Sequence, residues 1–360
     1  MMTRCLPRFR ASLCAVVLAL VCCAASARNL DGTLGLIMRP ISTVPTVVKA
    51  GESFEVTIRA DRPVEELRVA LYRGAEATMV FTHPRQQPPL APTEGVLTLR
   101  PTVPGTMQPG LYNLYVNVRP ERKADTAERA VKVIAEWPQE YRVAHVTDVH
   151  IGRQDPPLRD QVFERTASEI NRLGVDFALI TGDLTDQATP EQFRTFLQLL
   201  DHFEVPTFVT PGNHDRGDNT QFGAADAIYE RYCGLANYAF DFGRHRYLSL
   251  DTRWQDEFLV FPAYRAWLEA QLQRPDPALG IVFSHRISDA EYPYYEDTLP
   301  AHNYRLYMYG HTHDDAIDWV GPRRLMLENT GAELMSTYSV LRIAGDQVAA
   351  IRYYHRLSAD

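Results

Sequence analysis

The chain has almost no cysteine outside its N-terminal end. Of its five cysteines, Cys5, Cys14, Cys22 and Cys23 lie in the first part of the sequence, and only Cys233 remains beyond them. A single thiol cannot form an intramolecular disulfide, so we expect stability to come from apolar cores and from bound metal, even in an oxidising compartment. We interpret Cys233 as a small, buried apolar residue.

Basic clusters and long apolar runs are also scarce. The 37 Lys and Arg residues face 45 Asp and Glu residues, which gives a net charge of −8, and no segment gathers basic residues. Proteins bind long nucleic acids through clusters of Lys and Arg on the phosphates, so we exclude long nucleic acid as a partner. Beyond the N-terminal segment no apolar run is long enough to span a bilayer, so we expect no transmembrane segment in the mature chain.

The first 27 residues have the pattern of a secretory signal peptide. Arg4, Arg8 and Arg10 form a basic start, an apolar stretch covers residues 13–25, and Ala25-Ser26-Ala27 is a cleavage signal. We therefore predict an exported protein, periplasmic or secreted after cleavage near Ala27. Because the segment holds three arginines and no acid, its removal raises the excess of acidic residues from 8 to 11.

Two alternatives to a cleaved signal are a retained membrane anchor and a lipid attached at Cys23. The apolar stretch is short for a membrane span. Cys22 stands where a lipoprotein signal has a small residue. Both features favour cleavage.

Residues 28–136 have the pattern of an all-β domain. Apolar and polar residues alternate in short stretches, with turns at Ala50-Gly51-Glu52 and Pro109-Gly110. The clearest alternating stretches are 54–58, 67–71, 112–118 and 131–133. Short strands at this spacing favour an antiparallel β-sandwich, and the segment resembles immunoglobulin-like or fibronectin-type modules.

The pattern changes after the polar stretch 136–140, which we interpret as a linker, so residues 137–360 form a second domain. Its apolar runs predict strands at 143–147, 178–181, 207–210, 247–250 and 281–284. Helical patterns lie between them, at 158–173, at 192–200 after a Thr189-Pro190 start, and after Pro262, where Trp267 and Leu268 would be buried. Alternating strands and helices predict a layered α/β domain.

Five segments of metal-binding residues follow apolar runs in this second domain. They are Asp148 with His150, Asp183, Asn213 with His214 and Asp215, His285, and His311 with His313. Ligands of α/β sheets bind beyond the carboxyl ends of the strands, so we expect these segments to meet. Carboxylate, amide and imidazole donors together suit Zn, Mn, Fe or Co better than a thiolate-selective ion.

The spacing of the donors indicates two ions. In Asp148-Val149-His150, two donors stand two residues apart, and in an extended chain both side chains would project to the same side. Asp183 follows Gly182, which permits a tight turn, and a carboxylate can bridge two cations. Two divalent ions about 3.5–4 Å apart activate water and neutralise a phosphate for in-line attack, so the pattern indicates hydrolysis of phosphate esters by a metal-bridged hydroxide.

The segment after residue 212 contains a further candidate for catalysis. We interpret His214 as the group that stabilises the transition state and gives a proton to the leaving oxygen. Asp215 would orient His214 and raise its pKa, as a carboxylate partner does. Asp186 and Arg216 are interpreted as residues that fix loops.

Over about residues 142–357, the segments resemble the D-x-H, G-D, G-N-H-[DE], H and G-H-x-H blocks of the calcineurin-like metallophosphoesterase superfamily. The resemblance implies a four-layer α/β/β/α sandwich. It also implies that His214 is the catalytic histidine. The implied ligand sets are Asp148, His150, Asp183 and His313 for one ion, and Asp183, Asn213, His285 and His311 for the other.

Departures from the blocks narrow the branch of the superfamily. Purple acid phosphatases have a Tyr after their G-D block and lack the histidine that His150 represents. Thr185-Asp186-Gln187 and Asp215 depart from the protein Ser/Thr phosphatases. The blocks look more like the class III branch of cyclic-nucleotide and glycerophosphodiester phosphodiesterases. In that branch a second His or a Pro often stands near the position of His285, where this chain has Arg286-Ile287, so the substrate stays open.

Substrate-binding residues are sought beside the donor segments. Arg253 and Arg286 are candidates for gripping the phosphate, with surface ion pairing as the alternative. Tyr292 and Tyr294 lie in a Tyr-rich segment at 291–296 and are candidates for stacking on a base or sugar, with an ordinary packed loop as the alternative.

The leading hypothesis is an exported binuclear-metal hydrolase of phosphate esters, with small phosphodiesters favoured as substrates. A phosphomonoesterase or nucleotidase of the same fold is the second hypothesis, and a non-catalytic binding module is the third. The sequence leaves the metal identity, the substrate and the oligomeric state open.

The remaining histidines are interpreted as structural. His145 lies inside a predicted strand, so we expect it in the core or supporting the site. His83, His202, His245 and His355 are expected at the surface or in loops.

Overall fold

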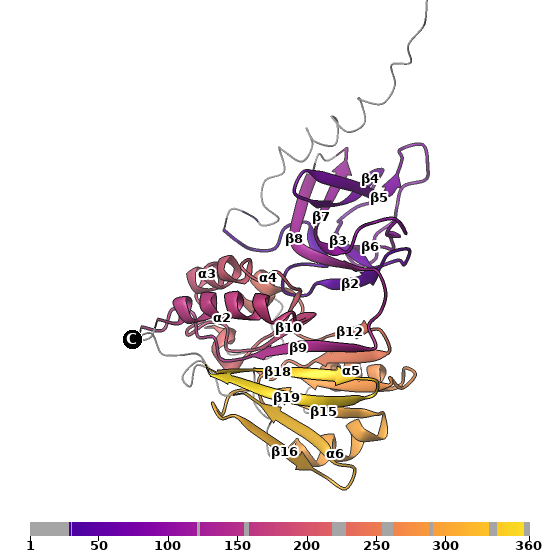
Figure 1. Cartoon of the computed structure of the whole chain (residues 1–360). Coiled ribbons are helices and arrows are strands. Elements are labelled where there is room, and N and C mark those ends of the chain that lie inside the picture. Colours follow the sequence, from indigo (N-terminus) through magenta and orange to yellow (C-terminus); the bar gives the residue numbers. More distant parts are fainter. Residues whose placement is uncertain are drawn as a thin grey trace, which may run out of the picture.

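A computed structural model of the whole chain describes residues 29, 31–120, 123–154, 158–217, 228–253, 262–287, 291–330 and 337–355 (Figure 1). The predicted signal peptide and Cys23 lie outside the described residues, as does the side chain of His355.

Two β-sheets form the N-terminal part of the fold (Figure 1). The larger sheet has the order β2-β8-β7-β4-β5 and contains β2 (Thr46–Lys49), β4 (Glu66–Arg73), β5 (Glu76–His83), β7 (Gly110–Arg119) and β8 (Lys123–Ile134). The smaller sheet has the order β1-β3-β6 and contains β1 (Ile37–Arg39), β3 (Val56–Arg59) and β6 (Val96–Leu99). Their pairings are antiparallel except for parallel β2 and β8. The strand-rich region is present, and its likeness to an immunoglobulin or fibronectin module stays a prediction.

A second five-stranded sheet, β11-β10-β9-β18-β19, carries three helices on its outer face (Figure 1). Its strands are β9 (Glu140–Val146), β10 (Phe177–Thr181), β11 (Thr207–Thr210), β18 (Thr337–Ala344) and β19 (Gln347–His355). The helices are α2 (Arg159–Leu173), α3 (Pro190–Leu200) and α4 (Ile228–Cys233). Their apolar residues share one core cluster with the outer face of β9 and β10. The Thr189 side chain accepts a hydrogen bond at the start of α3, as its capping pattern predicted.

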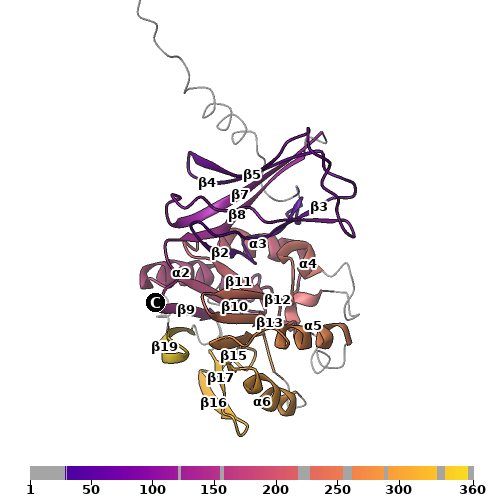
Figure 2. The ribbon, with the colours of Figure 1, turned by 90° about the vertical axis from the view of Figure 1, so that its right-hand side faces the viewer.

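The opposing six-stranded sheet has the order β12-β13-β14-β15-β17-β16 (Figure 2). Its strands are β12 (Tyr238–Phe242), β13 (His245–Ser249), β14 (Leu279–Phe283), β15 (Tyr304–Tyr309), β16 (Ala316–Val320) and β17 (Leu325–Asn329). Helices α5 (Pro262–Leu272) and α6 (Tyr292–Ala301) pack on its outer face through a separate apolar cluster. A short 3-10 helix, η1 (Asn213–Arg216), follows β11.

The inner faces of these two sheets meet in a common apolar core, so helices, sheet, sheet and helices form four layers. All five residues of β10 and all five of β14 are buried. Strands that are covered on both faces have continuous apolar sequences, and for this reason β10 and β14 could be predicted from the sequence. The predicted α/β/β/α sandwich, preceded by a β region, is confirmed.

The N-terminal β region and the layered domain share their core and several hydrogen bonds. One cluster of buried residues runs through both parts. The β11 edge is covered by the segment before β2: Val209 N–H donates to the Thr43 carbonyl (2.9 Å), and the Thr43 hydroxyl donates to the Cys233 carbonyl (2.7 Å). Arg129 donates to the carbonyls of Leu200 (2.8 Å) and Val205 (2.7 Å), beyond the reach of the helical bonds of α3.

Several local predictions need correction. The Tyr-rich segment is helix α6 rather than a loop, and Pro293 stands in its first turn, a favoured position for proline. In α5, Leu268 is buried but Trp267 is only half-buried. His83 and His245 are buried, whereas His202 is exposed as predicted.

Cys233 is a buried thiol, as the sequence indicated. None of the helices in the described ranges is both long and apolar enough to cross a membrane.

Candidate metal centre

The donor segments come together where the parallel strands end. Backbone pairing continues past the strand ends, because Asp148 N–H donates to the Gly182 carbonyl (3.0 Å) and His150 N–H donates to the Asp183 carbonyl (2.8 Å). Three groups of side chains result, each with its ligand atoms within 4.8 Å of one another. The groups are Asp148, His150 and His313; His150, Asp183 and His214; and Asp183, His285 and His311.

The backbone at these donors is left-handed rather than extended. Asp148, His150, Asp183, His311 and His313 all have φ between 47° and 71°. Non-glycine residues adopt this region at a cost and cluster at functional sites when the surrounding fold enforces it. The expected extended geometry at Asp148 and His150 is therefore wrong, although both side chains still reach the same site.

Two glycines allow the loops to approach each other closely. Gly182 has φ +86°, and a Cβ there would lie 2.6 Å from the His285 Cβ. A Cβ on Gly212 would lie 2.2 Å from Oδ1 of Asp183. Larger residues at either position would force apart the loops that carry Asp183, Asn213 and His285.

The first donor group lies between the loops after β9 and β15. His313 Nε2 is 3.1 Å from Asp148 Oδ1, and His150 Nε2 is 3.9 Å from the same oxygen. His150 Nε2 is also 3.7 Å from Asp183 Oδ2. Asp148 and His150 are buried, and His313 is half-buried. These atoms converge on one point, as ligands of a common ion would.

The group of Asp183, His285 and His311 shares Asp183 with the group of His150, Asp183 and His214. His285 Nε2 is 3.2 Å from Asp183 Oδ2 and 3.2 Å from His311 Nδ1. His285 is fully buried, whereas His311 is exposed. Two imidazole nitrogens and a carboxylate oxygen therefore face each other, with Asp183 common to both groups.

Buried polar atoms without partners show that these residues fit a metal. Neither ring nitrogen of His150 makes a hydrogen bond among the described residues, and neither does Oδ1 of Asn213, although all three atoms are buried. Orphaned buried atoms of this kind are costly, and a bound ion is a partner that would satisfy them. Nitrogen and hard oxygen donors suit divalent transition-metal ions, which would be held by the predicted ligands.

The electrostatics of the site divide its groups into anions, neutral imidazoles and one cation. Burial would raise the pKa of Asp183 and Asp148, but the charge on His285 acts together with hydrogen bonds and charges from the neighbouring histidines, so both pKa values lie below the ordinary value. Burial lowers the pKa of His150 to about 4, and burial together with the charge on His285 lowers that of His311 to about 4. Burial opposes protonation of His285, yet Asp183 and Asp148 raise its pKa to about 9.

His214 stands at the rim of the site with its ring held by a backbone group. Its Nδ1–H donates to the carbonyl of Asp186 at 2.7 Å, which leaves Nε2 directed at Asp183 Oδ2, 4.0 Å away. Its own N–H donates to Asp183 Oδ1 (2.8 Å). Asp186 therefore orients His214 through its backbone carbonyl. A sequence pattern of side chains does not predict a contact made by a backbone group.

Asp215 does not orient His214, contrary to the prediction. Its buried carboxylate accepts hydrogen bonds from the N–H of Gly212 (2.8 Å), Leu184 (3.0 Å) and Thr185 (3.0 Å) and from the Thr185 hydroxyl (2.8 Å). It thereby ties the loop after β10 to the loop after β11. Burial and the charge on Asp183 raise the pKa of Asp215 to about 6.

Arg253 is not available to a substrate phosphate, which corrects a second prediction. Its guanidinium donates to both oxygens of Asp251 (2.9 and 2.7 Å) and to both oxygens of Glu230, and it lies over the ring of Tyr229. The side chain is 2% exposed. Its two carboxylates raise the pKa of Arg253 well above its ordinary value against the effect of burial. Arg253 therefore anchors β13 to α4.

The other substrate-binding candidates lie in different surroundings. The charge on Arg286 is close enough to lower the pKa of His311 further. Tyr294 lies beneath the guanidinium of Arg265 from α5, with the guanidinium carbon 5.8 Å from its ring centre. Tyr292 is half-buried and packs in the apolar cluster under α6. Arg286 is thus the candidate that the structure ties to the donor groups.

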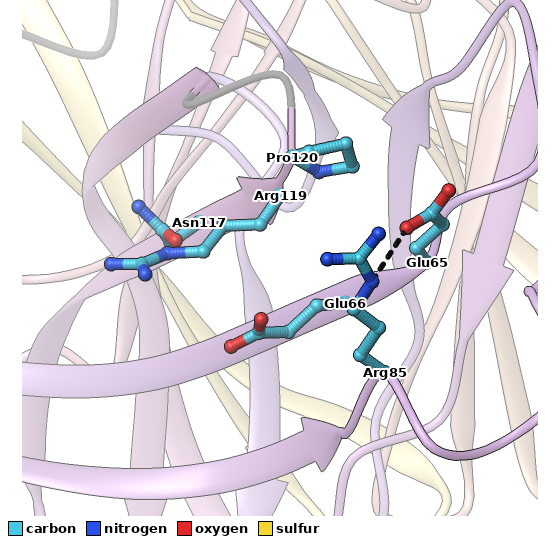
Figure 3. Close-up of a pocket in the computed structure, with 6 residues that line it drawn as sticks. All are labelled: Glu65, Glu66, Arg85, Asn117, Arg119 and Pro120. Atoms are coloured by element: carbon cyan, nitrogen blue, oxygen red, sulfur yellow. Dashed lines mark ion pairs between the residues drawn. The ribbon is translucent and has the colours of Figure 1, made fainter.

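A pocket of about 550 Å³ lies on the N-terminal β region (Figure 3). It is lined by Glu65, Glu66, Arg85, Asn117, Arg119 and Pro120. Arg85 pairs with Glu65 across it (3.1 Å). None of the sequence-predicted site residues lines this pocket, so it is separate from the donor groups.

Comparison with known proteins agrees with this site. Residues 141–315 match the family model "Calcineurin-like phosphoesterase". A probable glycerophosphodiester phosphodiesterase, GpdQ, of Arcobacter nitrofigilis is 41% identical over 84 residues, which are 21% of this chain and 31% of that protein. A probable cyclic nucleotide phosphodiesterase of Fibrobacter succinogenes is 22% identical over 150 residues, which are 40% of this chain and 56% of that protein. The matches thus span between 31% and 56% of the length of these relatives.

Among solved structures, purple acid phosphatase PPD1 from yellow lupin seeds has a TM-score of 0.50 at 13% identity, covering 85% of this chain and 72% of that one. At this identity the likeness shows the shared fold alone. The family match, the layered fold and the donor groups at the strand ends lead to one assignment: residues 141–315 of this chain form a calcineurin-like metallophosphoesterase domain.

Proposed function

We propose that the chain is an exported binuclear-metal hydrolase of phosphate esters that prefers phosphodiesters. The sharing of Asp183 between two groups of donors is the observation that carries the proposal. One ion would be held by Asp148, His150, Asp183 and His313, and the other by Asp183, Asn213, His285 and His311. Two bound divalent ions would supply Lewis-acid chemistry, neutralising the phosphate and activating water.

The protein itself contributes positioning and proton transfer. The Asp186 carbonyl fixes the His214 tautomer with its proton on Nδ1, and Nε2 is the atom turned toward Asp183. At 42% side-chain exposure, His214 can reach both substrate and solvent. When protonated at Nε2, it would give that proton to the leaving oxygen, the role of a general acid.

The charge around the donor groups favours a diester over a monoester. A diester carries one negative charge, whereas a monoester carries up to two. Of the two arginines considered for the phosphate, Arg253 is neutralised by Asp251 and Glu230, whereas the charge on Arg286 acts on the donor residue His311. The two curated relatives described above are also named as probable phosphodiesterases.

Export is proposed from the first 27 residues. Their basic start, apolar stretch and Ala25-Ser26-Ala27 signal support cleavage after Ala27. The test is the N-terminal residue of the protein recovered from the periplasm or medium. We expect Arg28, and an intact Met1 in the mature protein would refute export by this route.

The proposed reaction is tested with bis(p-nitrophenyl) phosphate and p-nitrophenyl phosphate, each with Mn²⁺ and with chelator. We expect higher kcat/KM on the diester and loss of activity with chelator. Asp183→Asn should lose activity on both esters because both donor groups share this carboxylate. Arg85→Gln, in the pocket on the N-terminal β region, is a matched control that should behave as wild type.

Each possible failure points to a different error. Preference for the monoester would favour the phosphomonoesterase alternative. Chelator-resistant activity would refute the metal mechanism. Metal binding without hydrolysis of either ester would favour the binding module.

A further inference from the structure

We infer that Glu328, His145 and Thr181 form a positioning chain that fixes the imidazole of His285 in the metal centre. The inference rests on the proposed function, because it concerns how this fold prepares one of the proposed ligands. All three members are buried, and none belongs to the donor groups.

The chain begins with a carboxylate between the two sheets. Glu328 on β17 accepts a hydrogen bond from the Ser339 hydroxyl of β18 at Oε1 (2.8 Å). Its Oε2 lies 2.6 Å from Nδ1 of His145 on β9. A carboxylate only accepts, so the Nδ1–H of His145 donates to it. Glu328 thereby joins the six-stranded sheet to the five-stranded sheet.

His145 links Glu328 to Thr181, the last residue of β10. In the neutral ring, with Nδ1–H given to Glu328, Nε2 is the acceptor. It lies 2.8 Å from the Thr181 hydroxyl, which donates to it. Every polar atom of the chain up to this point has a partner, which is the condition for a buried polar network to rigidify a site.

Thr181 then holds His285 through its backbone. The Thr181 carbonyl accepts from the His285 Nδ1–H (2.9 Å) and from the Thr147 hydroxyl (2.9 Å). With Nδ1 occupied in this way, Nε2 of His285 points at Asp183 and His311. Thr181 also precedes Gly182-Asp183, so its placement affects both the histidine and the shared carboxylate.

Residues that hydrogen-bond to a metal-ligating histidine affect how tightly the metal binds. A ligating histidine gives its other N–H to a carbonyl or carboxylate, which sets the tautomer and ring orientation. Loss of such a partner typically weakens metal binding about 10–100-fold. Here the acceptor is the Thr181 carbonyl. The hydroxyl of Thr181 is bound to His145, which is bound in turn to Glu328.

The test compares Thr181→Val with Thr181→Ser. Valine keeps the shape and the carbonyl but lacks the hydroxyl that His145 holds, whereas serine retains it. Glu328→Gln tests the far end of the chain. His245→Asn is the matched control: His245 is also buried with a hydroxyl partner, Tyr141 (2.7 Å), but it begins β13 at the strand end opposite the site.

Two measurements are made on folded protein. The first is Mn²⁺ affinity by calorimetry. We expect the affinity of the ion at His285 to fall about 10–100-fold in Thr181→Val and Glu328→Gln, and to change less than threefold in Thr181→Ser and His245→Asn. The second is solvent exchange of the His285 Nδ1–H by NMR in metal-free, ¹⁵N-histidine-labelled protein. We expect at least tenfold faster exchange in the first two variants only.

The outcomes separate the inference from the proposed function. If wild type binds Mn²⁺ and Thr181→Val and Glu328→Gln bind it equally well, the positioning chain is refuted and the proposed function stands. If wild type binds no Mn²⁺, the proposed function is refuted, and the exchange measurement alone decides whether the chain fixes His285. Equal losses in His245→Asn would show a general loss of stability and would also refute the inference.

Discussion

The metal-free protein should hold one extra proton at His285, and a metal ion must displace it. His285 lies between two buried carboxylates, and Asp183 and Asp148 raise its pKa to about 9 against the opposing effect of burial. The pKa of His150 and of His311 is lowered to about 4, so both are neutral at pH 7 and ready to ligate. Of these three histidines, His285 is therefore the one that loses a proton when metal binds at neutral pH.

The magnitude follows from the displaced proton. A cation and H⁺ compete for the same imidazole. The association constant of the ion held by His285 should therefore rise about tenfold per pH unit between pH 7 and about 9, and level off above that. Release of about one proton per ion at pH 7 should fall toward zero at pH 10. A rise in pH has the opposite effect on the folding stability of the metal-free protein. Protonated His285 contributes about 3 kcal/mol to that stability below pH 6.5, and this contribution is lost as the pH rises through about 9.

The assay is calorimetric titration of metal-free protein with Mn²⁺ in buffers of different ionisation enthalpy, from pH 6.5 to 10. The slope of observed enthalpy against buffer enthalpy gives the protons released. His285→Gln should remove the release, whereas His313→Gln should weaken binding but leave the proton at His285 to be displaced. A pH-independent affinity, or release near zero at pH 7 in wild type, would refute this account of the site.

Three further changes test separate parts of the structure. His214→Ala should keep metal affinity while kcat falls roughly 10²–10⁴-fold, the range for a general acid; loss of metal by calorimetry would make His214 a ligand instead. Asp215→Ala should lower the free energy of unfolding in urea by about 3 kcal/mol, because it strands three buried N–H donors; a loss below 1 kcal/mol would contradict its role in tying the loops. Arg129→Ala should cost about 2 kcal/mol by removing two hydrogen bonds, since the Val205 carbonyl loses its guanidinium donor and the Leu200 carbonyl keeps only the N–H of Phe203; an unchanged urea midpoint would show that Arg129 does not couple the β region to the layered domain.

The sequence predicted the central strands well because they are buried on both faces. Thr207–Thr210 is β11 at the predicted bounds, and β10 begins one residue earlier than expected. Continuous apolar runs are typical of such strands, and their ends are marked by the donors that follow. The strands β12, β15, β16, β17, β18 and β19 were not predicted. Exposed residues in β16 and the polar inner residue Glu328 in β17 blur the apolar pattern.

The site was predicted as a set of donors but not as a geometry. Asp148 and His150 are two residues apart whether the chain is extended or left-handed, so spacing alone led to the wrong backbone. Asp215 follows His214 in sequence, yet its carboxylate accepts from the N–H groups of Leu184 and Thr185, whereas the His214 ring donates to the Asp186 carbonyl. Residues that are adjacent in sequence share contacts only where the backbone conformation permits. The local sequence did not reveal the backbone conformation at these positions.

Long-range partners decided the remaining roles. Arg253 carries the charge that a phosphate site needs, but Glu230, 23 positions earlier in the chain, neutralises it. His145 and Glu328 are 183 positions apart and meet only because two sheets face each other. Such pairings depend on the packing of layers, which a single sequence does not encode locally.

By itself, the sequence determined which groups can hold metal and that they follow buried strands, because ligand chemistry and strand burial are written in residue types and short patterns. Only the tertiary structure decided that Asp215 and Arg253 serve the scaffold, and that a buried chain from Glu328 reaches His285. Those roles depend on distances between atoms far apart in sequence, and the stacking of the two sheets fixes these distances.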